Sequence, residues 1–209
     1  MSASREAILS RVREALGDGP TVSQAATRDY TRSGSLTGES LVERFCERAG
    51  DYRAEVRRVG AADLRDEIGR ALLARAARRI CIPAGLPAAW RPTGVELVED
   101  DGLAHDELDG LDGVLTGATL AIAETGTIVL SGAPAEGRRA LTLIPDLHVC
   151  VVAQQQIVEL VPEAIAALAP SRARAITFIS GPSATSDIEL RRVEGVHGPR
   201  TLVVFVATG

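Results

Sequence analysis

The sequence predicts an α/β fold, in which a mostly parallel sheet is flanked by helices and preceded by an N-terminal helical appendage. Short runs rich in Val, Ile and Leu alternate with segments whose apolar residues recur every three or four positions, a pattern typical of alternating strands and helices. The hydrophobic fraction of 45% is ample for a core. Because only 3% of the residues are aromatic, we expect this core to consist mainly of aliphatic side chains.

The individual elements follow from this periodicity. Apolar stripes predict helices over residues 8–16, 41–49, 64–76 and 161–168. Strands are expected over residues 52–59, 79–82, 95–98, 120–123, 127–130, 147–153, 175–179 and 202–207, with one more beginning at Gly113. The strands 120–123 and 127–130 are too close in sequence for a helical crossover, so they are expected to form an antiparallel hairpin.

The N-terminal region differs in composition from the rest of the chain. Residues 17–36 are rich in Gly, Ser, Thr and other small polar residues, which is typical of a flexible linker. We therefore predict an N-terminal helix and linker over residues 1–36 and an α/β domain over residues 37–209.

Composition and charge exclude several functional classes. The net charge of −5 argues against a nucleic-acid partner. All 23 basic residues are arginine, so the chain has neither a Schiff-base lysine nor the lysine of a Walker-type phosphate loop. No signal peptide and no apolar stretch of about 20 residues is found. We expect a cytoplasmic protein without a membrane span.

The cysteines and histidines do not predict a metal centre. Cys46, Cys81 and Cys150 are far apart, and three thiolates are too few for an iron–sulfur cluster or a closed zinc site. Cys81 and Cys150 lie in apolar runs, where buried, inert thiols are expected. His148 begins an apolar strand and is interpreted as a hydrogen-bonded core residue. No cofactor is therefore expected within this chain.

The most informative segment lies after the strand predicted at residues 175–179. Gly181 and Pro182 end that strand, and small, hydroxyl-bearing and acidic residues follow: Ser183, Thr185, Asp187 and Glu189. If the strand belongs to the parallel sheet, its carboxyl end opens into a ligand crevice, where free amides and hydroxyls bind an anion. The alternative is that these residues only cap a helix that begins near Ser186.

A second candidate segment is the hairpin turn formed by Glu124, Thr125, Gly126 and Thr127. Gly126 is expected to have a positive φ. In apolar surroundings the carboxylate of Glu124 would have a raised pKa and serve as a base or nucleophile. The alternative is a turn without chemistry. Further candidates for ligand binding are His197, which lies in a loop before the last strand, and Arg200 or Arg138 as the partner of a substrate carboxylate.

Four motifs together resemble a known family. Residues 123–130, 181–189 and 195–200, with Leu143-Ile-Pro-Asp-Leu-His148 between them, are similar to the signatures of the lactate-utilization protein C family, the LUD domain. The resemblance covers roughly residues 40–207. It implies the fold of the ribose-5-phosphate isomerase, glucosamine-6-phosphate isomerase and coenzyme A transferase superfamily.

The resemblance also implies a function. The chain would be a non-redox component of an iron–sulfur system that oxidises L-lactate to pyruvate, with the clusters on partner proteins and a small carboxylate, phosphorylated ligand or organic cofactor bound here. Two alternatives stay open: a stand-alone transferase or isomerase that acts on an acyl-coenzyme A or a phosphosugar through Glu124, and a metabolite-sensing module. The residues alone leave open whether the chain is itself an enzyme.

Overall fold

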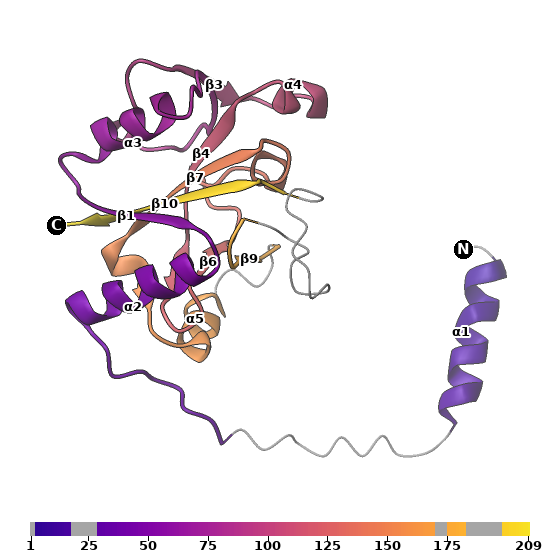
Figure 1. Ribbon diagram of the computed structural model, residues 1–209. Coiled ribbons are helices and arrows are strands. Elements are labelled where there is room, and N and C mark those ends of the chain that lie inside the picture. Colours follow the sequence, from indigo (N-terminus) through magenta and orange to yellow (C-terminus); the bar gives the residue numbers. More distant parts are fainter. Residues whose placement is uncertain (1–2, 18–28, 170–174, 183–197) are drawn as a thin grey trace. The chain divides into compact units, whose positions relative to one another are not determined.

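Figure 1 shows the computed structural model, which describes residues 3–17, 29–169, 175–182 and 198–209. The chain divides into two compact units, Met1–Tyr30 and Thr31–Gly209. The described part of the first unit contains the helix α1 (Ala3–Leu16), on which Ile8, Val12 and Leu16 are exposed. The domain boundary expected after residue 36 remains a prediction.

The second unit contains the remaining elements. Its helices and 3-10 turns are α2 (Gly38–Asp51), α3 (Leu64–Leu73), η1 (Ala88–Trp90), α4 (His105–Asp109), η2 (Arg139–Thr142), η3 (Gln154–Gln156) and α5 (Val161–Ala167). Its strands are β1 (Glu55–Gly60), β2 (Arg79–Pro83), β3 (Glu96–Asp100), β4 (Gly113–Gly117), β5 (Leu120–Ile122), β6 (Thr127–Leu130), β7 (Leu147–Ala153), β8 (Ile157–Val158), β9 (Thr177–Ile179) and β10 (Thr201–Thr208). Among the described residues, no helix is long and apolar enough to cross a membrane.

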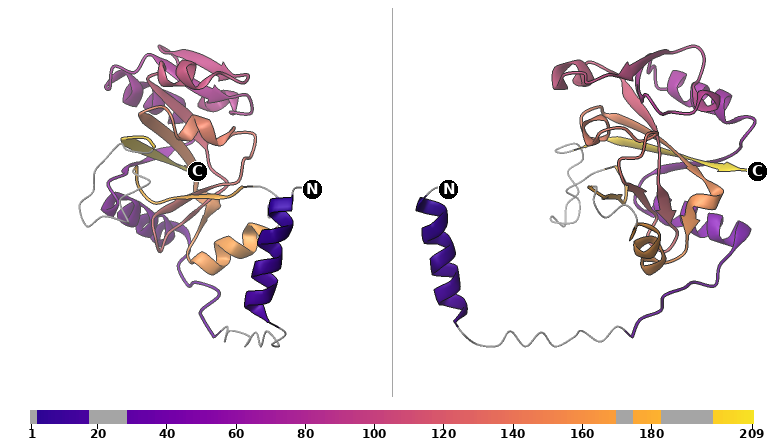
Figure 2. Two further views of the ribbon diagram at one scale, coloured as in Figure 1. Left: turned by 90° about the vertical axis from the view of Figure 1, so that its right-hand side faces the viewer. Right: turned by 180° about the vertical axis from the view of Figure 1, so that it is seen from behind.

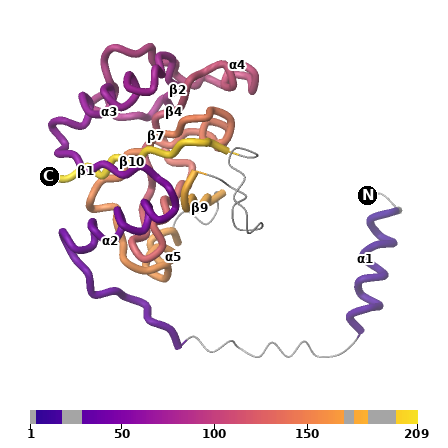
Figure 3. Tube along the Cα trace, in the orientation of Figure 1, coloured from indigo at the N-terminus to yellow at the C-terminus, as the bar shows by residue number. Residues whose placement is uncertain are grey.

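The main sheet confirms the predicted α/β fold. Six strands pair in the order β1-β10-β7-β4-β2-β3, and all five pairings are parallel. The last strand of the chain, β10, lies between β1 and β7, as the trace in Figure 3 shows. A strand paired on both sides and covered on both faces needs an uninterrupted apolar run, which residues 202–207 supply.

Alternate residues of β10 enter two different cores. Val203 and Phe205 pack with α3 on one face of the main sheet. Val204 and Val206 pack on the other face, with α2 and the strands β5 and β6. Complete burial of each such side chain contributes about 1.5–3 kcal/mol. The apolar faces of α2 and α3 therefore hold the sheet between two layers (Figure 1).

A second, smaller sheet pairs in the order β8-β5-β6-β9. Strands β5 and β6 are antiparallel, which confirms the predicted hairpin. Its residues Ala121 and Ile128 face the core shared with the main sheet, while Leu120, Ile122 and Val129 pack against α5. Figure 2 shows α5 beside this sheet from two further directions. This hairpin carries one of the predicted site segments at its turn.

Strand β9 differs from the prediction. The apolar run 175–179 was expected to form a buried strand of the main sheet. The structure instead pairs β9 with β6 in the small sheet, antiparallel, and leaves Phe178 46% exposed. The reason is that a short apolar run specifies a strand but not its partner, which depends on contacts far away in sequence. Because β9 leads to Gly181, this placement also decides where the predicted anion-binding segment begins.

Candidate functional site

Two neighbouring cavities lie against η2, and the inner one reaches the amino ends of β7 and β10. The inner cavity has a volume of about 260 Å³ and is lined by Arg139, Thr142, His148, Phe178, Ile179, Ser180, Gly181, Pro182, Gly198, Pro199 and Leu202. The outer cavity has a volume of about 460 Å³ and is lined by Leu130, Ser131, Gly132, Glu136, Gly137, Arg138, Arg139, Thr142, Ala175 and Thr177. Because Arg139 and Thr142 line both, the two cavities adjoin at these side chains.

The position of these cavities differs from the predicted crevice. His148 and Leu202 are each the second residue of their strand, and they are paired in the sheet. The inner cavity therefore lies at the amino ends of these two parallel strands, whereas a crevice at the carboxyl edge was expected. The difference follows from β9, since its carboxyl end reaches this region through the small sheet.

Arg139 stands where the two cavities meet. It begins η2, and its Nη1 donates hydrogen bonds to the carbonyl oxygen and to the Oγ1 of Thr142, at 3.1 Å and 2.5 Å. Thr142 is only 2% exposed, so it is a fixed support. The side chain of Arg139 is open to solvent, and desolvation by the surrounding protein lowers the pKa of its guanidinium. Among the described residues no carboxylate pairs with it.

His148 is a buried neutral group in the wall of the inner cavity. It is 1% exposed, and its Nε2 lies 2.8 Å from the Oγ1 of Thr116. Burial, together with the weaker effect of the charge of Arg139, lowers the pKa of His148 to about 3. The predicted interpretation as a satisfied core histidine is confirmed. At neutral pH this imidazole adds no charge to the cavity.

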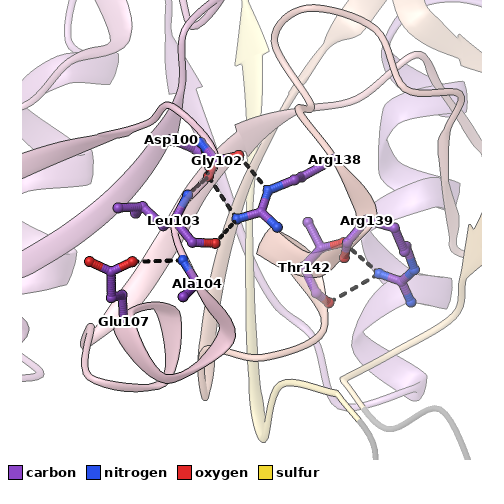
Figure 4. Close-up of polar contacts among 8 residues, drawn as sticks. All are labelled: Asp100, Gly102, Leu103, Ala104, Glu107, Arg138, Arg139 and Thr142. Atoms are coloured by element: carbon purple, nitrogen blue, oxygen red, sulfur yellow. Dashed lines mark hydrogen bonds and ion pairs between the residues drawn. The ribbon is translucent and has the colours of Figure 1, made fainter.

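Arg138 has a different environment from Arg139, as Figure 4 shows. Its Nε and Nη2 donate to the two carboxylate oxygens of Asp100, both at 2.8 Å, and Nη2 also donates to the carbonyl oxygen of Leu103. The hydrogen bonds from Arg138 lower the pKa of Asp100, whose side chain is 8% exposed. Arg138 therefore has its own carboxylate, and this contact ties the start of η2 to the end of β3.

The outer cavity contains a buried carboxylate. Glu136 is 2% exposed and accepts hydrogen bonds from the backbone N–H groups of Ser131 and Ala133, at 2.8 Å and 2.9 Å, and from the Oγ1 of Thr119. Three donors satisfy this carboxylate without a counter-ion. Its clearest role is to hold the bend between β6 and η2, which positions Arg139.

The hairpin turn is connected to the inner cavity through hydroxyl groups. The Oγ1 atoms of Thr125 and Thr127 are 2.6 Å apart, and the Oγ1 of Thr127 lies 2.8 Å from the Oγ of Ser180, a residue of the cavity wall. Gly126 has a φ of 61°, as predicted, and a Cβ there would lie 2.3 Å from the backbone nitrogen of Ala49. The turn therefore packs tightly against α2 and fixes the hydroxyl chain.

Gly181 is required for two reasons at the rim of the inner cavity. Its φ is 88°, which side chains rarely adopt, and a Cβ would lie 2.4 Å from the carbonyl oxygen of Tyr52. The close approach of the chain at this point keeps Ser180 and Gly181 in the wall. Of the predicted site residues, Thr125, Thr127 and Gly181 thus belong to one region with Ser180.

Two other predicted site residues lie elsewhere. Glu124 is exposed and lines neither cavity; its backbone N–H donates to the carbonyl oxygen of Glu159 at 2.9 Å. The apolar surroundings expected around its carboxylate are therefore absent, while its catalytic role stays a prediction. Arg200 is also exposed and forms an ion pair of 3.5 Å with Asp146.

The remaining predicted site residues, Ser183, Thr185, Asp187, Glu189 and His197, lie outside the described residues. The described residues on either side of them, Pro182 and Gly198, both line the inner cavity. Within the described ranges, no three His, Cys, Asp or Glu side chains lie close enough to hold a metal ion.

Sequence reasoning missed three residues of this site: Glu136, Arg139 and Ser180. A weak signal was available in the run Glu136-Gly-Arg-Arg139, where adjacent charges follow a glycine between two strands. In a chain with 23 basic residues, all arginine, one adjacent pair attracts little notice. Ser180 directly precedes the segment that was singled out and could have been included with it.

The cysteines have the environments that were predicted. Cys81 and Cys150 are fully buried, and burial is the main reason that their pKa values rise to about 11 and about 12. Cys150 lies in the core beneath the hairpin, whereas Cys81 packs with Leu108 and Leu141. Cys46, on α2, is partly exposed, and burial raises its thiol pKa as well.

Comparisons with known proteins agree with this structure. Residues 42–207 match the protein family described as the LUD domain. A lactate utilization protein C of Deinococcus radiodurans is 49% identical over 180 residues, which are 85% of this chain and 84% of that protein. One of Halalkalibacterium halodurans is 28% identical over 93% of this chain and 94% of its own. A solved structure of a DUF162 family protein from Deinococcus radiodurans superposes with a TM-score of 0.73 and 43% sequence identity. The match covers 83% of this chain and 100% of that structure.

Proposed function

The chain belongs to the LUD domain family, and from that membership we propose that it serves lactate utilization as a non-redox component of an iron–sulfur system that oxidises L-lactate to pyruvate. The family resemblance noted in the motifs is thereby confirmed. The proposal is carried by one observation, the 49% identity with a lactate utilization protein C over 85% of this chain and 84% of the relative. Similarity over so much of both proteins favours a common role.

The cysteines support the assignment of redox chemistry to partner proteins. An iron–sulfur cluster is usually held by four thiolates, and this chain has three cysteines, two of them fully buried in separate cores. Only Cys46 is accessible, and one thiol cannot hold a cluster. We therefore assign the clusters to other components and the binding of a small carboxylate or an organic cofactor to this chain.

The cavities give this chain a place for that ligand. They join an accessible arginine to hydroxyl groups and an apolar wall, the combination that orients small organic acids. By contrast, Glu124 lines neither cavity, so no observation favours the transferase or isomerase reading over this one.

The proposal is tested in the organism that encodes the chain. A strain that lacks the gene should fail to grow on L-lactate while it grows normally on pyruvate, and the restored gene should reverse the defect. Tagged protein purified from cells grown on lactate should bring iron-containing proteins with it, as measured by iron analysis and mass spectrometry. Normal growth on lactate without the gene would refute the proposal.

A further inference from the structure

We infer that the inner cavity is a binding site for a short monocarboxylate, whose carboxylate pairs with the Nε and Nη2 edge of Arg139. The inference deepens the proposed function by naming the ligand class and the residues. It rests on that function only for the choice of L-lactate and pyruvate as probes. The predicted carboxylate partners, Arg138 and Arg200, are replaced here by Arg139, which was not among the predicted site residues.

The donor atoms of Arg139 provide the first argument. A guanidinium binds a carboxylate through two parallel N–H groups, most often in bidentate geometry. The described hydrogen bonds of Arg139 engage only Nη1, which donates twice to Thr142. They leave Nε and Nη2 available, and the same two atoms of the neighbouring Arg138 hold the carboxylate of Asp100. The molecule thus contains an example of the proposed contact one residue away.

The charge of the inner cavity provides the second argument. Arg139 is the only charged side chain in its described lining, because His148 is neutral and no Asp or Glu belongs to that lining. Within this described lining, one positive charge matches one negative charge. The described wall offers the further charge of a dicarboxylate or a phosphate dianion only hydroxyls, a neutral imidazole and backbone groups.

Shape and polarity provide the third argument. At about 260 Å³ the cavity is smaller than the usual range of about 300–1,000 Å³ for drug-sized ligands, so it suits a small acid. Phe178, Leu202 and Pro182 give it an apolar side for a methyl or short alkyl group. The hydroxyl of Ser180 lies in the same wall and both donates and accepts hydrogen bonds. It therefore suits a 2-hydroxy or a 2-oxo group equally.

The test is a titration of the purified full chain with L-lactate, pyruvate, succinate and L-lactamide, followed by calorimetry and by ligand-observed NMR. Lactamide has the shape of lactate without its charge. We expect saturable binding of both monocarboxylates, with affinities within about tenfold of each other because Ser180 serves either oxygen. Succinate and lactamide should bind at least about tenfold more weakly, since one carries an extra charge and the other none. Equal binding of lactamide and lactate would overturn the inference.

Variants locate the site. Arg139→Gln should weaken monocarboxylate binding about tenfold to a hundredfold, and Arg139→Lys, which keeps the charge without the fork, should lie between it and the parent protein. Arg200→Gln is the matched control and should bind normally, because Arg200 is exposed and lines neither cavity. Unchanged binding in Arg139→Gln would refute the site. Thermal melts check folding, and the comparison of lactate with lactamide needs no variant.

Failure of this inference can be distinguished from failure of the proposed function. If the gene is dispensable for growth on lactate but the protein binds pyruvate through Arg139, the site stands and the cellular role falls. If the gene is required but Arg139→Gln restores growth and the purified chain binds no monocarboxylate, the role stands and the site falls.

Discussion

Arg138 and Arg139 are adjacent in sequence and have opposite environments. The fork of Arg138 is filled by the carboxylate of Asp100, which is only 8% exposed, and the carbonyl oxygen of Leu103 adds a third contact. Arg139 lines two cavities, and its described hydrogen bonds to Thr142 use only Nη1. The difference teaches that the residue type sets what an arginine can bind, whereas the fold decides whether that partner is already supplied.

The two roles depend on each other. Arg138 joins the residue before η2 to the end of β3, 38 positions away in sequence, and Arg139 is the first residue of η2. An anchored neighbour restricts the backbone from which Arg139 projects, which keeps the loss of conformational freedom on ligand binding small. We therefore regard Arg138 as a positioning residue for Arg139.

The largest expected effect on stability comes from breaking the ion pair between Arg138 and Asp100. Arg138→Gln leaves the nearly buried carboxylate of Asp100 without its cation, so we expect a loss of about 3 kcal/mol in the free energy of unfolding, measured with urea. Arg139→Gln is the matched variant and should cost less than about 1 kcal/mol, because its side chain is open to solvent. Equal losses in the two variants would contradict the comparison.

The same pair should respond to acid. Because Arg138 lowers the pKa of Asp100, the stabilisation that the pair supplies is fully present above the unfolded pKa of about 4. It is lost as the pH falls through the lower pKa of the folded state. In Arg138→Gln this part of the acid sensitivity should be smaller than in the parent protein.

A second, intermediate effect concerns His148, which lies beside Arg139. Its pKa is about 3 in the folded protein against an ordinary value of 6.5, so below pH 6.5 the unfolded state binds the extra proton. Stability should then fall with falling pH by at most about 1.4 kcal/mol per pH unit, or about 2 kcal/mol at pH 5. Above pH 6.5 the imidazole contributes no pH dependence.

Urea titrations from pH 7 to pH 4 check this expectation. In His148→Gln the amide can still meet the hydroxyl of Thr116, and the slope between pH 6.5 and 5 should decrease. Arg139→Gln should leave the slope in this range unchanged, since burial is the main cause of the lowered pKa and still keeps the folded imidazole neutral at pH 5. An identical slope in His148→Gln and the parent protein would show that His148 is not the group responsible.

The smallest effect is expected at Arg200. Its ion pair with Asp146 has a distance of 3.5 Å, and both side chains are 64% exposed. Solvent and salt screen such pairs, so Arg200→Gln should change the free energy of unfolding by less than about 0.5 kcal/mol. A loss as large as that in Arg138→Gln would mean that exposure is a poor guide to the roles of arginines in this chain.

The sequence predicted the local structure of the chain well. The apolar stripes of α2 and α3, the buried runs of β7 and β10, and the turn at Gly126 all follow from short-range periodicity or backbone conformation. These features depend on residues within one or two turns of each other, and this is the range over which patterns in a sequence are informative.

The site was predicted only in part. Gly181 and the threonines of the hairpin do lie in one region, because β6 and β9 are paired. That pairing, however, joins residues about 50 positions apart, and no local pattern encodes it. No local pattern encodes the contact of Arg138 with Asp100 either, because these residues are 38 positions apart. That contact occupies Arg138 and leaves Arg139 as the accessible one of the two adjacent arginines.

The two buried thiols can report local unfolding of this protein. With pKa values of about 11 and about 12, Cys81 and Cys150 carry almost no thiolate at neutral pH and are shielded from reagents. An alkylating reagent therefore reaches each sulfur only when the elements packed over it move away. These elements are α4 and η2 for Cys81, and α2 and the β5–β6 hairpin for Cys150. The alkylation rates of Cys81 and Cys150, measured by mass spectrometry, would therefore report the opening rates of these two regions separately, with no introduced cysteine.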